Sequence, residues 1–287
     1  MDLDTQRARA RTFRDSHGEA ADGPLLLANA WDAASAVVFE RLGVAAVGTT
    51  SAGIAASLGY PDGEHVPREE MIAAIGRIAD SVALPVSADI EAGYGDTPAA
   101  VGETVTRTLA AGAVGVNVED GTGDPDEPLR STADHAARIR AARAAADDAG
   151  VPAVVNGRTD VFWAGVGAES DRLDRAVERA DAYVDAGSDC VFVPGVADPD
   201  TIEALARRID APLNVLGGPG APSVPALGDL GVARVSVGSG PMRATLGRLE
   251  TIGEELLAAG TYESMAEAVP YGDLAALLAA ARERREA

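Results

Sequence analysis

The stretch PVSADIEAGYGDTPAAVGETVTRTLAAGAVGVNVE, residues 85–119, contains one complete structural unit. It begins and ends with short apolar runs, at 85–90 and 113–119, in which polar residues do not alternate with apolar ones. Such runs are typical of parallel strands that are buried on both faces. Between them, Pro98 marks a helix start and Gly112 a helix end. The stretch therefore predicts a strand, a helix and a second strand.

The same unit recurs along the chain. Strands are predicted at 25–30, 45–50, 85–90, 113–119, 152–158, 190–195, 212–217 and 232–238. Helices are predicted at 33–43, 68–82, 97–112, 133–150, 171–187 and 198–209. This alternation predicts an α/β fold, a (β/α)8 TIM barrel formed by one domain over 1–287, with 241–287 as a C-terminal helical extension. A doubly wound open sheet is the alternative, less favoured because no Gly-x-Gly-x-x-Gly follows the first strand.

The composition excludes several classes of protein. The formal charge of −21 over 287 residues argues against nucleic acid as a partner. The chain contains no lysine, so catalysis through a lysine Schiff base is impossible. Its single cysteine, Cys190, excludes a disulfide framework and is expected to be buried in the sixth strand. No apolar run reaches the about 18 residues of a membrane span, and the first residues lack the apolar centre of a secretory signal. We therefore expect a cytoplasmic protein without a membrane partner.

Three carboxylates follow neighbouring strands. Asp89 and Glu91 end the third predicted strand, and Glu119 ends the fourth. Because active sites of such barrels lie at the C-terminal ends of the strands, we expect these side chains to converge. Converging carboxylates need a proton or a cation between them, and oxygen ligands suit Mg²⁺ or Mn²⁺, held partly through water. The alternative for Glu91 is that it caps a backbone turn or pairs with an arginine.

Arg158 at the end of the fifth strand is the obvious counter-charge. A guanidinium in this place can grip the carboxylate of a small ligand through two parallel hydrogen bonds. The alternative is an internal salt bridge to Glu119 or Asp160. The three histidines, His17, His65 and His135, are predicted to be peripheral, and His65 is a minor acid/base candidate because its loop follows the second strand.

Five motifs together resemble the isocitrate lyase/phosphoenolpyruvate mutase family. They are NAWDAASA (29–36), TTSAGIAASLGYPDGE (49–64), ADIEAGYGDT (88–97), GVNVEDG (115–121) and NGRTD (156–160). The resemblance implies a (β/α)8 barrel whose last helix is exchanged between subunits, usually in a dimer of dimers. It also implies Mg²⁺ and a small carboxylate substrate, a 2-oxo acid or its derivative. A homotetramer is therefore expected.

The resemblance also assigns metal ligands and catalytic residues. Asp89 matches the first metal carboxylate, Glu119 matches the acid after the fourth strand, and Glu91 stands where the family usually has a second aspartate. Arg158 matches the arginine that grips the substrate anion. Asp32, together with Glu119 and Arg158, is expected to be catalytic.

The remaining substrate-binding residues come from the same motifs and strand ends. Ser51 and Gly53 match the segment that holds the 2-oxo acid carboxylate. The other residues expected to bind the substrate are Trp31, Asp62, Asn156 and Asn214.

One departure from the family pattern decides the expected reaction. The family's lyases carry a Lys-Cys-Gly-His type motif in the loop after the fourth strand, and its cysteine acts as acid and base. Here that place reads VEDGTGDPDEPLRSTAD (118–134), without cysteine, lysine or histidine. What remains predicts a Mg²⁺-dependent carbon–carbon lyase or decarboxylase. It would act through a metal-stabilised enolate on a 2-oxo or 2-hydroxy di- or tricarboxylate, oxaloacetate-like or methylisocitrate-like. The alternatives are a catalytically weak 2-oxo acid-binding protein and a P–C bond enzyme of the phosphonopyruvate type.

Overall fold

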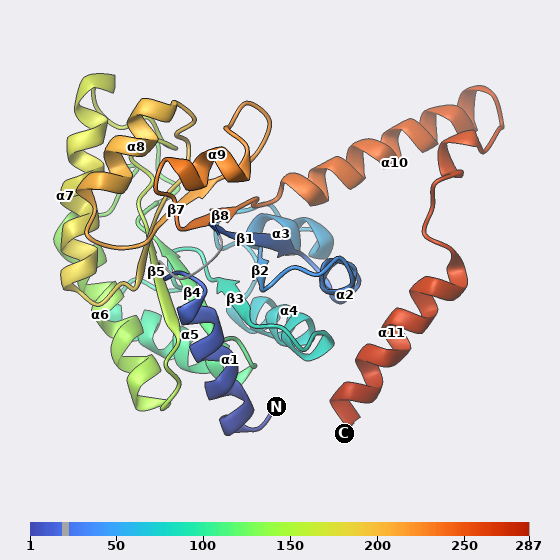
Figure 1. Ribbon diagram of the computed structural model, residues 1–287, viewed down its shortest axis with the longest axis horizontal. Helices are drawn as coiled ribbons and strands as arrows, with labels where there is room; N and C mark the ends of the chain where they lie inside the picture. Colours follow the sequence, from blue (N-terminus) through green and yellow to red (C-terminus); the bar gives the residue numbers. More distant parts are fainter. Residues whose placement is uncertain (19–22, 287) are drawn as a thin grey trace.

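A computed structural model describes residues 1–18 and 23–286 of the chain. Eight parallel strands form a closed barrel, and the first strand pairs with the last (Figure 1). The strands are β1 Leu25–Ala30, β2 Val47–Thr49, β3 Val86–Asp89, β4 Gly115–Glu119, β5 Val154–Arg158, β6 Cys190–Val193, β7 Leu213–Leu216 and β8 Arg234–Ser236. The predicted TIM barrel is confirmed, and each predicted strand contains one observed strand.

Helices follow the strands, and all but the last of them cover the outside of the barrel (Figure 1). They are α2 Ala33–Arg41, α3 Ser51–Leu58, α4 Arg68–Ser81, α5 Pro98–Ala110, α6 Thr132–Asp148, α7 Arg172–Asp185, α8 Pro199–Arg208, α9 Val224–Asp229 and α10 Gly240–Ala258. Two short 3-10 turns, Glu169–Asp171 and Glu263–Met265, lie in connecting segments. None of the helices in the described part of the chain is long and apolar enough to cross a membrane.

The unpredicted helix α1 (Leu3–Asp15) packs across the amino-terminal ends of the strands. Its Gln6 side chain donates to the carbonyl oxygens of Leu109 and Ala113, just before β4, at 2.7 and 2.9 Å. Its Phe13 ring is fully buried, and a Cβ on Gly115 would come within 2.9 Å of it. Close approach of α1 to the barrel therefore requires glycine at the first residue of β4.

Two of the three histidines contradict the prediction of peripheral positions. His17 lies after α1 with its ring edge-on to Phe13, and His135 of α6 is fully buried against Tyr183. Burial lowers the pKa of both histidines to about 4. His65 is exposed, as predicted for a loop residue.

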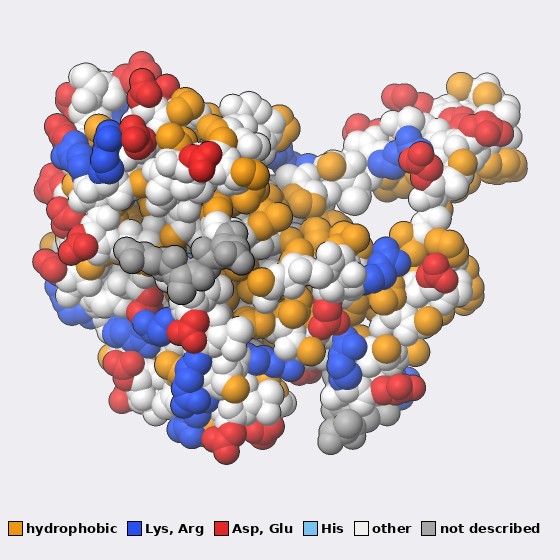
Figure 2. Space-filling view, viewed as in Figure 1, with side chains coloured by type: hydrophobic (Ala, Val, Ile, Leu, Met, Phe, Trp, Pro, Cys, Tyr) orange, Lys and Arg blue, Asp and Glu red, His pale blue; other side chains and the backbone are white. Residues whose placement is uncertain are grey.

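The last barrel helix, α10, does not cover its own barrel. It projects away from the strands, and the chain then returns to α11 (Tyr271–Glu286), which packs on α2 and α4 (Figure 1). Arg284 of α11 forms an ion pair with Glu40 at 2.7 Å. Four leucines of α10 are 41–91% exposed, namely Leu246, Leu249, Leu256 and Leu257. Hydrophobic side chains are visible both on the projecting helix and on the neighbouring barrel surface (Figure 2).

We predict that α10 is buried between subunits of a homotetramer, because a projecting helix with this apolar face is unfavourable in water. Light scattering of the protein at micromolar concentration should give four chains per particle. The double substitution Leu249→Glu and Leu257→Glu should dissociate the assembly while leaving the barrel's circular dichroism unchanged. A monomeric parent protein would reject the prediction.

Candidate active site

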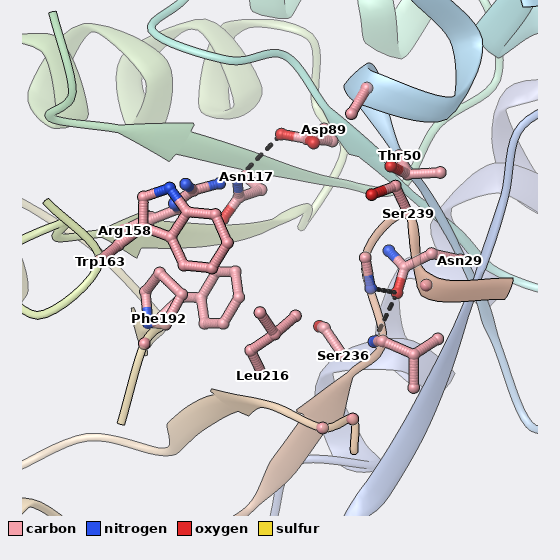
Figure 3. A pocket seen from close by; sticks show the side chains of 18 of the residues that line it. Asn29, Thr50, Asp89, Asn117, Arg158, Trp163, Phe192, Leu216, Ser236 and Ser239 are labelled. Carbon is pink, nitrogen blue, oxygen red and sulfur yellow. Dashed lines mark hydrogen bonds between the residues drawn. The ribbon is translucent and has the colours of Figure 1, made fainter. Parts of the chain in front are cut away.

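A cavity of about 420 Å³ opens at the carboxyl ends of the strands. Four predicted site residues lie on its wall, Ser51, Asp62, Asp89 and Arg158. In Figure 3, Arg158 lies with the aromatic side chains of Trp163 and Phe192 on one side, and Asn29, Thr50, Ser236 and Ser239 lie on the other. The remaining predicted residues are not on the wall.

Asp89 is held rigidly at the edge of this cavity. Its Oδ2 accepts hydrogen bonds from the Ser51 backbone N–H at 3.1 Å and from the Ser51 hydroxyl at 2.8 Å. Its Oδ1 accepts from Asn117 Nδ2 at 3.0 Å (Figure 3). These bonds fix the carboxylate between the ends of β2 and β4.

Gly53 is needed for this arrangement and lies outside the cavity wall. It is in the first turn of α3, where its N–H donates to the Thr50 hydroxyl at 3.3 Å. A Cβ on Gly53 would lie 2.9 Å from the Trp31 Cβ and 2.6 Å from the Thr50 Cγ2. Only glycine therefore lets α3 begin here, with the Ser51 N–H directed at Asp89.

The Glu91 side chain forms hydrogen bonds with the neighbouring loops and does not line the cavity. It adopts φ 53°, which is uncommon for a residue with a side chain. Its buried carboxylate accepts hydrogen bonds from the Glu64 backbone N–H and, at 2.7 Å, from the Tyr94 hydroxyl. Burial raises the pKa of Glu91 to about 7. The structure thus shows the turn-capping contact, and a role in metal binding stays a prediction.

The acidic groups at the cavity mouth fit a hard divalent cation by their chemistry. Within the described residues, no three acidic, histidine or cysteine side chains are grouped closely enough to hold a metal ion by themselves. Asp62 and Asp89 nevertheless share the cavity wall, and burial followed by the charge of Asp89 raises the pKa of Asp62. Mg²⁺ commonly keeps several waters and needs only one or two carboxylates, so a metal ion at Asp89 stays a prediction that the absence of a three-residue cluster does not contradict.

Arg158 is the centre of a buried charge network. Its Nη1 lies 2.8 Å from Glu119 Oε2, while Nε and Nη2 donate to the two Asp160 oxygens at 2.6 and 3.0 Å. Burial raises the pKa of both carboxyl groups, and the guanidinium charge opposes that shift. The internal salt bridge is therefore present. A guanidinium has five N–H donors, so two remain for a ligand on the cavity wall.

Asp120 holds this charge network in place through hydrogen bonds. It is fully buried, and its Oδ1 accepts from the Asp160 backbone N–H at 2.8 Å. Its Oδ2 accepts from Arg179 at 2.9 Å and from the Tyr183 hydroxyl at 2.7 Å. The sequence gives no sign of this role, because Arg179 and Tyr183 lie on α7, about 60 residues further along the chain.

The two predicted asparagines do not line the cavity but form hydrogen bonds with residues that do. Asn156 Nδ2 donates to Asn117 Oδ1 at 2.9 Å, and Asn117 in turn holds Asp89. Asn214 Nδ2 donates to the Ser236 hydroxyl at 3.1 Å. Both asparagines position wall residues, so their direct contact with a substrate stays a prediction.

Asp32 caps helix α2. Its Oδ1 accepts from the Ser35 N–H at 2.7 Å, and the Ser35 hydroxyl completes a capping box. Asp32 is exposed, and neither it nor Trp31 is on the cavity wall. A catalytic role for Asp32 and a substrate contact for Trp31 stay predictions.

The loop after β4 contributes nothing to the cavity wall. Gly121 and Leu129 form an isolated antiparallel bridge that closes the loop on itself. None of residues 118–134 lines the cavity, and the described wall residues include no histidine, cysteine or tyrosine. The wall instead includes residues that the sequence analysis did not select, among them Asn29, Trp163, Phe192, Arg234 and Arg243.

Similarity to known proteins assigns the chain to a family. Residues 13–257 match the family model for phosphoenolpyruvate phosphomutase. The chain belongs to the isocitrate lyase/phosphoenolpyruvate mutase family. A Burkholderia cenocepacia protein of known structure, provisionally assigned as a lyase or mutase, is 38% identical with a TM-score of 0.89, and the match covers 96% of this chain and 97% of that one.

Family members with named activities are also similar. The 2-methylisocitrate lyase of Escherichia coli is 31% identical over 199 residues, which make up 67% of this chain and 64% of that enzyme. The oxaloacetate decarboxylase of Rhodopseudomonas palustris strain BisA53 is 36% identical over 169 residues, 57% of this chain and 55% of that enzyme. These relatives are lyases, and the chain is an enzyme of the same family.

Truncation of Arg158 should destabilise the protein. Arg158→Ala leaves Glu119 and Asp160 buried without their cation, which typically costs about 3–5 kcal/mol. Urea unfolding should show a loss of this size. Arg207→Ala is the matched control, because its ion pair with Glu203 is largely exposed and should contribute little. Equal stability of the two variants would contradict the network.

Cys190 should be dispensable and unreactive. It is fully buried in β6, and burial raises its thiol pKa to about 12. Cys190→Ala should keep the parent's activity and lose about 1 kcal/mol of stability. A chromogenic thiol reagent should label the folded parent far more slowly than the urea-unfolded chain. Full loss of turnover in a folded Cys190→Ala protein would show a cysteine-dependent mechanism instead.

Proposed function

We propose that this enzyme is a Mg²⁺- or Mn²⁺-dependent carbon–carbon lyase or decarboxylase for a small 2-oxo or 2-hydroxy di- or tricarboxylate. Oxaloacetate is the substrate that the site favours. The observation that carries this proposal is the cavity wall itself, where carboxylates and guanidinium groups are present and the described residues include no histidine, cysteine or tyrosine.

The missing base favours decarboxylation over aldol-type cleavage. Cleavage of a 2-hydroxy acid requires a base to remove the hydroxyl proton, and in this proposal the two wall carboxylates, Asp62 and Asp89, would be occupied by the cation. Loss of CO₂ from a 3-carboxy-2-oxo acid needs no such step, because the breaking C–C bond leaves its electron pair on the substrate. Water at the open cavity mouth would then supply the proton for the product.

The chain's own residues have separate roles in this proposal. Asp89, supported by Asp62, would hold the cation. The two spare N–H groups of Arg158 would orient the substrate carboxylate, while Trp163 and Phe192 limit water around it. When bound, the metal would supply Lewis-acid polarisation of the 2-oxo carbonyl oxygen.

A second candidate is a 2-oxo acid-binding protein with weak or no turnover. The short loop after β4, which places no side chain on the wall, favours it. A phosphonopyruvate-type reaction has less support, because the loop lacks the lysine that the mutases of the family use. Cytoplasmic location remains part of the proposal.

Steady-state assays should detect pyruvate from oxaloacetate in the presence of Mg²⁺, and a chelator should abolish the enzymatic rate. Asp89→Asn should lower kcat/KM at least about 100-fold, the size commonly seen when one electrostatic stabiliser of a transition state is lost. The matched control is Asp148→Asn, which changes an exposed carboxylate at the end of α6. An equal rate in both variants would reject the proposed metal ligand, and binding without turnover of any acid tested would favour the binding protein.

A further inference from the structure

A second guanidinium is buried in the cavity and lacks a direct counter-charge. Arg234 is the first residue of β8, is 3% exposed and lines the cavity. Its guanidinium lies 5.8 Å above the centre of the Phe13 ring. In the part of the chain that the structure describes, Arg234 has no ion pair, and its Nη1 has no hydrogen-bond partner. Its Nε makes one long bond, 3.4 Å, to the Ser236 hydroxyl.

The two cavity arginines therefore differ in what they offer a ligand. Arg158 is paired with both Glu119 and Asp160, so that trio has an excess of negative charge. Arg234 stays charged, because a guanidinium does not lose its proton in proteins, and burial of an unpaired charge is strongly unfavourable. An anionic ligand would relieve this cost at Arg234, whereas Arg158 already has two carboxylate partners and could offer a ligand only its spare N–H groups.

A neighbouring group shares the need for an acceptor. The hydroxyl of Ser87 on β3 lines the same cavity, is buried and has no hydrogen-bond partner. Asp89 is the carboxylate on the wall that influences the pKa of Arg234, which burial lowers. A cation bound at Asp89 would cancel the electrostatic effect of the Asp89 carboxylate on Arg234. The Arg234 guanidinium would therefore need an anionic partner most when the metal site is filled.

We propose that Arg234 is the specificity-determining residue of the cavity, and that it binds the second carboxylate of a dicarboxylate substrate. The 2-oxo acid end would lie near Asp89 and Arg158, higher in the barrel. A carboxylate fits because its two oxygens match the parallel N–H groups of a guanidinium. This inference rests on the proposed function, since it concerns the far end of the same substrate.

Two probes of different length separate the two ends of the cavity. In oxalate the two carboxylate carbons are bonded directly to each other, whereas in malate two carbons separate the carboxylates, so malate extends further from the metal site toward Arg234. Each is titrated calorimetrically, with Mg²⁺ present, into the parent, Arg234→Met and the control Arg207→Met, which removes an exposed arginine of α8 outside the cavity wall.

Arg234→Met should bind malate at least about 30-fold more weakly than the parent, as expected when one partner of a buried charge pair is removed. Its affinity for oxalate should stay within about threefold, and Arg207→Met should bind both probes like the parent. Unchanged malate affinity in Arg234→Met, or equal losses for both probes, would overturn the inference. An equal loss of malate affinity in Arg207→Met would also overturn it.

Stability distinguishes a ligand-binding arginine from a structural one. Without ligand, Arg234→Met should unfold at the same or a higher urea concentration than the parent, because methionine replaces an unpaired buried charge. A marked loss of stability would show that the guanidinium supports the fold instead. A chloride titration at constant ionic strength tests for a resident inorganic anion: chloride stabilisation that depends on Arg234 and that malate cannot displace would overturn the substrate role.

The proposed function and this inference can fail separately. If malate binds through Arg234 but oxalate does not bind with Mg²⁺ and no acid is turned over, the proposed function fails and the subsite stands. If oxaloacetate is decarboxylated but malate binds equally to the parent and Arg234→Met, the function stands and the subsite is rejected. A parent that does not bind malate rejects the subsite in either case.

Discussion

The arrangement of the site depends on the salt bridges that Arg158 makes with Glu119 and Asp160. These bonds tie the end of β4 to the end of β5 and bury three charged groups together. Asp120 holds the backbone of Asp160 and is itself fixed by α7, so the network extends from the barrel to its outer helices. A buried network of this kind is stable only when every charge has a partner. It leaves Asp62 and Asp89 as the carboxylates on the cavity wall, and oxygen ligands of this kind suit a divalent cation.

The barrel could be predicted from the sequence because buried parallel strands appear as short, continuous apolar runs. The apolar runs before Asp89 and Glu119 correspond to β3 and β4, and the helix between them starts at Pro98 as predicted. Helix α1 escaped prediction because its polar sequence buries only Gln6, Ala10 and Phe13. The signal for α1 lies instead in tertiary contacts with the strand ends, which no local pattern reveals.

The site could be predicted only in part, because the sequence locates the ends of the strands but does not show which side chains contact one another. Ser51 and Asp89 were predicted to belong to one site, and they lie in direct contact. Glu91 was expected to converge with Asp89 because both end the third predicted strand, but its left-handed backbone turns the carboxylate toward Glu64 and Tyr94. Arg234 was missed because it starts a strand, where the sequence alone suggests a position away from the active-site end.

In the proposed function, a metal ion and a substrate anion would meet beside a wall whose described residues include no histidine, cysteine or tyrosine. Such a cavity would catalyse steps that need proton removal poorly. Decarboxylation needs mainly stabilisation of the negative charge that develops on the substrate. Similarity to both 2-methylisocitrate lyase and oxaloacetate decarboxylase is compatible with this division, because the two enzymes share one family barrel.

In the proposed function a divalent cation and a 2-oxo acid share the cavity beside Asp89, and the relaxation rate of water protons with Mn²⁺ reports on both. The protein is expected to enhance relaxation by bound Mn²⁺, oxalate to lower this enhancement by displacing water from the ion, and Asp89→Asn to abolish the enhancement. An enhancement that oxalate does not change, or that persists in Asp89→Asn, would contradict the proposed function.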